Sequence, residues 1–187
     1  MRCKPVLILT LVASFLLLSA CSEEFKLTKS IYTDWWPVHA TGSADSDLFS
    51  ASWDGDLDKH GNIDVTFKNK TNPSVTFTQT YNYRALSFSK SREKFCYINL
   101  NDNYSSSRYL KFEIKDGMIY MEKLREDGGR TGEMEEGKPI ELKDENILVI
   151  GGVTYQKYSY YKETHPDQFK SSIFKDNERI PILSYEY

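Results

Sequence analysis

The chain has few cysteines and no apolar run long enough to cross a membrane as a helix, and each shortage excludes a class of protein. The chain has 187 residues and three cysteines. Cys3 lies just before the N-terminal apolar run, and Cys21 lies just after it. Only Cys96 remains in the rest of the chain, so no disulfide framework is expected. The longest apolar run covers residues 6–18, whereas a membrane-spanning helix needs about 20 residues.

Clusters of basic residues are also scarce. The chain carries 24 Lys and Arg against 27 Asp and Glu, a net charge of −3. If residues 1–20 were removed, Arg2 and Lys4 would go with them, and the remaining 167 residues would carry 22 − 27 = −5. Nucleic acids and anionic lipid head groups attract clustered Lys and Arg, so neither is expected as a partner.

Catalytic and cofactor-binding motifs are missing. There is no Gly-x-Ser-x-Gly, and Gly128-Gly129 and Gly151-Gly152 lack the spacing of a phosphate-binding loop. Cys96 lies between Phe95 and Tyr97 in an apolar strand pattern, where burial would raise its thiol pKa and leave it inert. We therefore expect no enzyme activity, no catalytic residue and no cofactor.

One acidic series resembles the start of a calcium loop. Asp54, Asp56 and Asp58 precede Gly61, but an EF-hand loop would need glycine at 59 and glutamate at 65, where the chain has lysine and valine. The same spacing fits the solvated face of a strand. His39, His60 and His165 share no motif, and no metal site is expected.

The N-terminus carries an export pattern. Arg2 and Lys4 precede the apolar run, and the run ends in Leu18-Ser19-Ala20-Cys21. These four residues resemble the lipobox of bacterial lipoproteins, which implies cleavage before Cys21, a covalent lipid on its thiol and attachment to a membrane. The alternative is an ordinary signal peptide whose cysteine is incidental.

Most of the remaining chain alternates between apolar and polar residues, as half-buried strands do. Residues 49–57 alternate first, 59–62 turn the chain, and residues 63–67 and 75–83 continue the pattern around Asn72-Pro73. Similar segments follow at residues 86–88, 95–100, 109–114, 118–124, 140–142, 147–150 and 153–161. Turn residues separate them, among them Asp116-Gly117, Asp144-Glu145-Asn146 and Gly151-Gly152. The order predicts an all-β fold, an antiparallel up-and-down β-barrel of about eight to ten strands.

Two segments interrupt the alternation. Residues 125–137 form a polar stretch that is either a mouth or lid element or a plain surface connection. Near the C-terminus, Thr164-His165-Pro166-Asp167 is a helix-start pattern with Phe169 and Ile173 on one face, which predicts a short C-terminal helix. Residues 179–187 add either a last strand or a segment lying across the barrel.

The order of these features resembles the lipocalin-like lipoproteins of the Bacteroidota, over roughly residues 30–160. A lipobox is followed by the tryptophan-bearing segment Ile31-Tyr32-Thr33-Asp34-Trp35-Trp36-Pro37-Val38-His39, then by successive hairpins, of which Lys115-Asp116-Gly117-Met118-Ile119-Tyr120 is a late one. Lipocalins place Gly-x-Trp in the first strand. In this chain the residues two positions before Trp35 and Trp36 are Thr33 and Asp34, so neither tryptophan has the glycine. Ser22-Glu23-Glu24 is similar to the short acidic signal that exports such lipoproteins to the cell surface. The resemblance implies a barrel around a cavity for a small apolar or amphipathic ligand, attached to the outer membrane on its periplasmic or surface face.

The expected organisation has four parts. These are a signal peptide (1–20), a lipidated tether (21–30), a lipocalin-like barrel (31–162) and a helical or strand extension (163–187).

Aromatic side chains are the candidate ligand contacts, because the chain has 13 tyrosines, 10 phenylalanines and 3 tryptophans. Trp36, Trp53, Tyr81 and Tyr83 are the predicted ligand-binding residues, although tryptophans on strands are more often core and tyrosines can turn outward. The predicted function is a membrane-anchored carrier of a small hydrophobic or amphipathic ligand. The alternatives are a surface glycan-binding module and an envelope protein that contacts another protein.

Overall fold

A computed structural model describes residue 27 and residues 29–98, 109–125 and 129–169 of the chain. Twelve strands lie in these ranges: β1 (Asp34–Asp45), β2 (Phe49–Asp56), β3 (Asn62–Asn69), β4 (Thr76–Asn82), β5 (Ala85–Ser89), β6 (Lys94–Ile98), β7 (Leu110–Lys115), β8 (Met118–Leu124), β9 (Arg130–Met134), β10 (Lys138–Leu142), β11 (Ile147–Ile150) and β12 (Val153–Lys157). Helix α2 (Tyr158–Thr164) and the 3₁₀ turn η1 (Pro166–Phe169) follow.

Eight of the strands close a barrel. The hydrogen-bonded neighbours run β1, β5, β6, β7, β8, β10, β11, β12, every pair is antiparallel, and β12 returns to β1. The closing pair extends from Trp35 opposite Lys157 to Ala40 opposite Val153. Chain order and ring order coincide, so the predicted up-and-down antiparallel barrel is confirmed.

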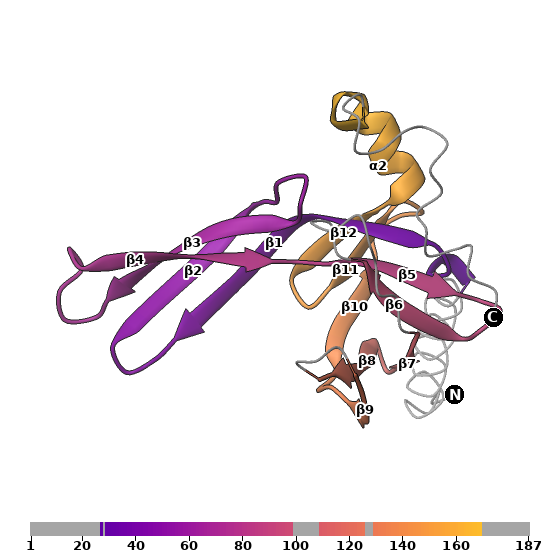
Figure 1. The fold of residues 1–187 in the computed structure, drawn as a ribbon, viewed down its shortest axis with the longest axis horizontal. Helices are drawn as coiled ribbons and strands as arrows, with labels where there is room; N and C mark the ends of the chain where they lie inside the picture. The colour runs from indigo at the N-terminus through magenta and orange to yellow at the C-terminus, as the bar shows by residue number, and fades with distance from the viewer. Residues whose placement is uncertain (1–26, 28, 99–108, 126–128, 170–187) are drawn as a thin grey trace, which may run out of the picture.

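The other part of the sheet is an arm that leaves the barrel (Figure 1). Strand β1 is 12 residues long, and its second half, from His39 to Asp45, pairs with β2. His39 and Ala40 still pair with β12 on their other side, and the strand leaves the ring beyond them. Strands β3 and β4 extend the arm, and β4 ends it. The sequence pattern predicted residues 49–83 as consecutive barrel strands. Strands do form there, but the ring passes from β1 directly to β5, so that their place in the barrel was predicted wrongly.

One end of the barrel is filled by its own core. Trp35, Phe95 and Leu110 are fully buried between the walls, and Trp35 Nε1 donates a hydrogen bond to the carbonyl oxygen of Ile31 (2.9 Å). Ile31 and Leu27, which precede the first strand, are themselves buried in this cluster. The segment before β1 therefore closes that end.

Helix α2 covers the outer wall of the barrel, and it begins earlier than the sequence predicted. Residues 158–161 were read as the end of a strand and a helix was expected from Thr164, whereas β12 ends at Lys157 and the helix starts at Tyr158. Tyr158 and Tyr161 lie three residues apart on the helix, and their rings contact Trp36 at centroid distances of 5.3 and 5.6 Å. This packing overrides the strand preference of consecutive tyrosines.

The polar stretch 125–137 contains a strand. Residues Arg130–Met134 form β9, which pairs with β8 and lies beside the ring path. Its anchor is Glu122, a fully buried carboxylate that accepts hydrogen bonds from Arg130 Nε (2.9 Å), Arg130 Nη2 (2.8 Å) and two backbone N–H groups, those of Lys111 and Gly132. The sequence pattern, which left a mouth or lid element and a plain surface connection open for residues 125–137, did not predict this strand. No helix in the described part of the chain is long and apolar enough to cross a membrane.

Candidate functional site

The end of the barrel next to the arm opens into a cavity of about 610 Å³. This volume lies within the roughly 300 to 1,000 Å³ of small-molecule sites. The lining residues come from the end of β4 and the β4–β5 junction, from β5, β6, β8, β10, β11 and β12, and from the turns that follow β8, β9 and β11. They are Asn82, Tyr83, Arg84, Leu86, Tyr97, Met121, Leu124, Arg125, Glu135, Lys138, Ile150, Gly151, Val153 and Tyr155.

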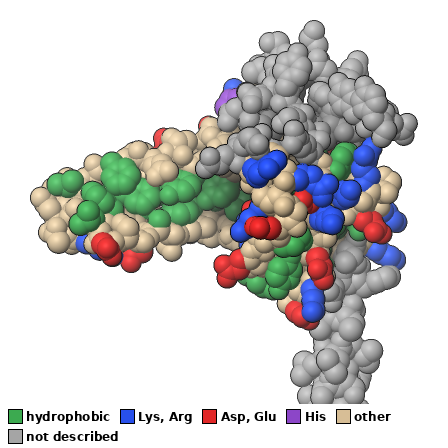
Figure 2. Space-filling model, turned by 60° about the horizontal axis from the view of Figure 1, so that its bottom comes forward, with side chains coloured by type: hydrophobic (Ala, Val, Ile, Leu, Met, Phe, Trp, Pro, Cys, Tyr) green, Lys and Arg blue, Asp and Glu red, His purple; other side chains and the backbone are tan. Residues whose placement is uncertain are grey.

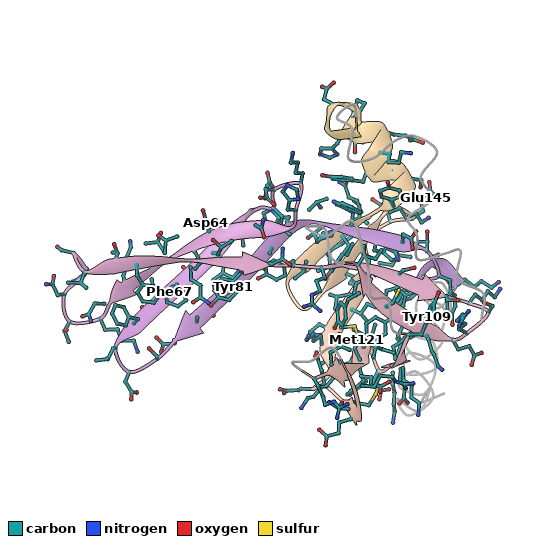
Figure 3. All side chains as sticks on the ribbon, in the orientation of Figure 1. Asp64, Phe67, Tyr81, Tyr109, Met121 and Glu145 are labelled. Atoms are coloured by element: carbon teal, nitrogen blue, oxygen red, sulfur yellow. The ribbon has the colours of Figure 1, made fainter. Side chains whose placement is uncertain are left out.

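The floor of the cavity is apolar. Leu86, Met121 and Ile150 line it and are also members of the buried barrel core. In Figure 3, Met121 lies among the barrel side chains, away from the arm. The cavity is thus the unfilled end of the same core that Trp35 and Phe95 fill at the other end.

Three tyrosines bring hydroxyl groups to this apolar space. Burial, together with the nearby carboxylate of Glu135, raises the pKa of Tyr97 to about 12, and the guanidinium of Arg84 opposes that shift. Burial also raises the pKa of Tyr155, with a further contribution from the neighbouring Tyr97 and Tyr83. Both phenols are neutral at physiological pH and can donate or accept a hydrogen bond.

Positive charge predominates around the opening. Among the described residues that line it, Arg84, Arg125 and Lys138 are basic and Glu135 is acidic, so these four side chains sum to 3 − 1 = +2 in a chain whose net charge is −3. Lys138 Nζ lies 2.7 Å from Glu135 Oε2, and the guanidinium of Arg84 lies 5.7 Å from the centroid of the Tyr97 ring. Basic side chains beside an apolar floor attract the anionic end of an amphipathic molecule.

A line of aromatic rings connects this opening to the arm. Trp53 Nε1 donates a hydrogen bond to the hydroxyl of Tyr83 (3.2 Å), and the Trp53 ring stacks on Tyr81 at 5.2 Å. Tyr81 in turn lies 6.5 Å from Phe67. Figure 3 shows Phe67 and Tyr81 close together in the arm.

The predicted ligand residues fall in three different places. Tyr83 lines the cavity, whereas Trp53 and Tyr81 do not line it and lie next to Tyr83 in the line of rings. Trp36 lies on the outer wall beneath helix α2. Nothing in the cavity geometry supports a ligand contact for Trp36, and as contacts the four remain predictions. Cys21, the predicted lipidation site, lies outside the described residues.

Sequence reasoning missed most of the cavity. Tyr97 and Tyr155 alternate correctly with their strand neighbours, and this was the signal available for their inward direction. Arg84 directly follows Tyr83, but Lys138 and Arg125 reach the opening from strands and a turn that are remote in sequence. No local pattern could have grouped them.

The acidic series has a partner that the sequence did not indicate. His39 lies between two of its members, with Nε2 2.7 Å from Asp54 Oδ1 and Nδ1 2.9 Å from Asp56 Oδ1. Asp58 instead holds the β2–β3 turn by accepting bonds from the backbone N–H groups of His60 and Asn62. Within the described ranges, no three His, Cys, Asp or Glu side chains are arranged to hold a metal ion.

Cys96 is buried and unpaired with another cysteine, and it faces the outer-wall cluster beneath α2 rather than the cavity. Burial raises the pKa of its thiol to about 12, with a smaller contribution from Asp34, while Ser87 opposes the shift. The predicted direction of the pKa shift is confirmed, and the thiol cannot serve as a nucleophile near neutral pH.

No known protein family, curated protein or solved structure matches the chain.

Proposed function

We propose that the barrel binds a small amphipathic molecule, with its apolar part on the cavity floor and its anionic group among the cations of the opening. The observation that carries this proposal is that an unfilled apolar barrel end is lined, among the described residues, by the basic side chains of Arg84, Arg125 and Lys138 and by one carboxylate, that of Glu135. Apolar walls with a few placed polar groups are typical of small-molecule sites. The role is binding and not catalysis.

The rings of the arm are arranged less well for binding a sugar. Phe67 and Phe77 are parallel to within 2° at 4.8 Å, and Trp53 stacks on Tyr81, so that one face of each of these rings is covered by its partner. A glycan platform needs free faces. The amphiphile is therefore the better-supported ligand.

A lipid on Cys21 would keep this binding site at a membrane. The support for lipidation is the sequence Leu18-Ser19-Ala20-Cys21 alone. The proposed outer-membrane location rests on the resemblance to the Bacteroidota lipoproteins, to which Ser22-Glu23-Glu24 contributes. Metabolic labelling with palmitate tests it. Label incorporated into the wild-type chain and lost in Cys21→Ser supports lipidation, whereas label retained in Cys21→Ser contradicts it.

Ligand binding is tested with two fluorescent probes of similar shape, the anionic anilinonaphthalene sulfonate and the uncharged N-phenylnaphthylamine. Val153 lines the cavity, and Val153→Trp should fill part of it and weaken both probes several-fold. Thr154→Trp is the matched control, since the next residue of β12 points to the other face. Met121→Trp fills the cavity from another strand, which guards against a folding defect in one variant. Equal binding by the wild type and both filled variants would overturn the proposal.

The charge of the ligand is tested with the same probes. Arg84→Gln and Lys138→Gln should weaken the sulfonate and leave the uncharged amine unchanged. Lys143→Gln is the control, because Lys143 pairs with Glu141 on the surface and does not line the cavity. Equal loss of both probes would contradict the anionic head group while leaving the cavity itself in place. Native mass spectrometry of the chain after exposure to an envelope extract then identifies the bound molecule.

A further inference from the structure

The far end of the arm exposes apolar side chains in a way that the rest of the described surface does not. Four large hydrophobic residues in the described ranges are strongly exposed, and three of them lie at this end: Leu48 (62 %), Val75 (48 %) and Phe77 (45 %). The fourth, Met134 (37 %), is in β9. Figure 2 shows the hydrophobic stripe that continues from the arm tip towards the barrel.

The tip, defined here as Leu48, Val75 and Phe77, is held in place by its surroundings. The backbone N–H of Lys70 donates to the carbonyl oxygen of Leu48 (2.9 Å), which ties the β1–β2 turn to the β3–β4 turn. The N–H of Asn69 donates to the carbonyl oxygen of Val75 (3.0 Å). Phe77 stacks on Phe67. The apolar tip is therefore a fixed feature of the arm and not a frayed end.

The size of the tip argues against a protein partner as its main occupant. Three partly exposed side chains offer roughly 300 Å² of apolar surface, whereas a stable protein interface buries about 800 Å² on each partner. A lipid bilayer needs no complementary shape and accepts a small projecting apolar point. The charges next to the tip balance, since Asp45 and Asp47 stand against Lys68 and Lys70, and Lys70 Nζ lies 2.9 Å from Asp45 Oδ1. An uncharged lipid surface fits this chemistry.

The tip is continuous with the cavity through rings that contact one another. Phe77 lies 4.8 Å from Phe67, Phe67 lies 6.5 Å from Tyr81, and Tyr81 lies 5.2 Å from Trp53. Trp53 then donates to the hydroxyl of Tyr83, which lines the cavity. The opposite face of the arm is polar, where Thr80 Oγ1 donates to Asp64 Oδ1 (2.6 Å) and Thr66 bonds Thr78. Only one face offers an apolar path.

We infer that the arm tip inserts Leu48, Val75 and Phe77 into a lipid bilayer and that the ring-bearing face of the arm leads apolar chains from the bilayer to the barrel cavity. Insertion of the tip into a bilayer does not depend on whether the cavity binds a ligand. The delivery step rests on the proposed function.

The experiment uses the full chain with Cys3→Ser and Cys21→Ser, so that an environment-sensitive fluorophore reacts only with an introduced cysteine. Cys96 does not compete, since it is buried and its thiol pKa is about 12. Ser74→Cys places the fluorophore beside Val75 at the tip, and Glu133→Cys places it beside Met134 as the control site. The probe is a phosphatidylcholine vesicle with or without bromine on its acyl chains.

Tip insertion predicts a blue shift and quenching by brominated lipid at position 74 and neither effect at position 133. Adding Leu48→Ser and Val75→Ser should abolish the signal at position 74, whereas Met134→Ser should leave it intact. A fluorophore at position 74 that stays unquenched while the chain is bound to vesicles would overturn the inference. So would a response at position 74 to an envelope protein fraction without lipid, which would assign the tip to a protein partner.

Transfer of N-phenylnaphthylamine from vesicles to the protein separates delivery from binding. The serine variants of Leu48 and Val75 should take up the probe from vesicles several-fold more slowly and bind it normally from solution. If uptake from vesicles is unchanged, the delivery role is wrong even though the cavity binds. If binding from solution is absent in every variant and in the wild type, the proposed function fails, and the quenching result still decides the tip.

Discussion

The indole of Trp53 lies directly over Gly42, its antiparallel partner across β1 and β2. A Cβ atom at position 42 would overlap with the six-membered part of the indole, so that the ring can reach Tyr81 and Tyr83 only because residue 42 has no side chain. One glycine in the arm thus determines whether the line of rings is continuous with the cavity.

Gly42→Ala should displace the indole, break the bond from Trp53 Nε1 to the Tyr83 hydroxyl and lower the free energy of unfolding by about 1 to 3 kcal/mol. A red shift of the Trp53 emission, assigned by difference from Trp53→Phe, and a thermal melt measure the two effects. Gly55→Ala is the matched control in the same strand pair, where the new Cβ would lie 3.3 Å from the flexible end of Ile63. Equal stability and emission of the two alanine variants would contradict this account of Gly42.

His39 should titrate above its ordinary value of 6.5, because its pKa is raised first by the hydrogen bond to Asp56 and then by the bond to Asp54. NMR titration of the imidazole measures it, and the double variant Asp54→Asn, Asp56→Asn should return it towards 6.5. Since the folded-state pKa is the higher one, the stabilisation is complete below pH 6.5 and is lost as pH rises through the folded-state pKa. The difference in free energy of unfolding between the wild type and the double variant should therefore shrink as pH rises through the folded-state pKa of His39. An imidazole pKa that is unchanged in the double variant would refute the role of the carboxylates.

Glu122→Gln should lower the free energy of unfolding by roughly 1.5 to 3 kcal/mol, because it removes the buried charge that Arg130 and two backbone N–H groups share. The bonds from Arg130 lower the pKa of Glu122 to about 2 from an ordinary value of 4.5. The stabilisation is therefore complete above pH 4.5 and is lost as pH falls towards 2.

Urea denaturation of both proteins between these pH values measures the difference. Glu141→Gln is the control, because its pair with Lys143 (2.7 Å) is exposed on both sides and should change stability by less than about 1 kcal/mol. If Glu122→Gln were as mild as Glu141→Gln, the buried carboxylate would not anchor β9.

Gly152→Ala should weaken the seam that closes the barrel. Gly152 has φ +83°, and a Cβ there would lie 2.8 Å from the carbonyl oxygen of Thr41, whose N–H donates to the carbonyl oxygen of Gly152 (2.9 Å). Gly117→Ala is the matched control, with φ +72° and open space around the new Cβ, and should cost only the backbone strain of about 1 kcal/mol. Thermal melts should rank Gly152→Ala clearly below Gly117→Ala. The reverse order would show that contact with Thr41 does not limit this turn.

The elements that could be predicted are those that depend on neighbouring residues. Alternation located most of the strands, and the turns Asp116-Gly117 and Gly151-Gly152 lie where expected, with positive φ at all four residues. The tyrosines of α2 show the limit of such reasoning, since residues 158–161 were predicted as the end of a strand and form a helix in which Tyr158 and Tyr161 pack on Trp36.

The sequence by itself determined an all-β chain in meander order, because strand propensity, alternation and turn chemistry act over a few residues. It also required Trp35 and Trp36 to face opposite sides of one strand, but it could not say which of them faces the core. Only the tertiary structure decided that β1 bonds to β12, with Thr41 and Gly152 separated by 111 positions, and that β2, β3 and β4 leave the ring as an arm. The tertiary structure also decided that Arg84, Arg125 and Lys138 meet at the opening of the cavity. Contacts of this kind join segments that no local pattern relates, and their energies depend on which faces meet when the barrel closes.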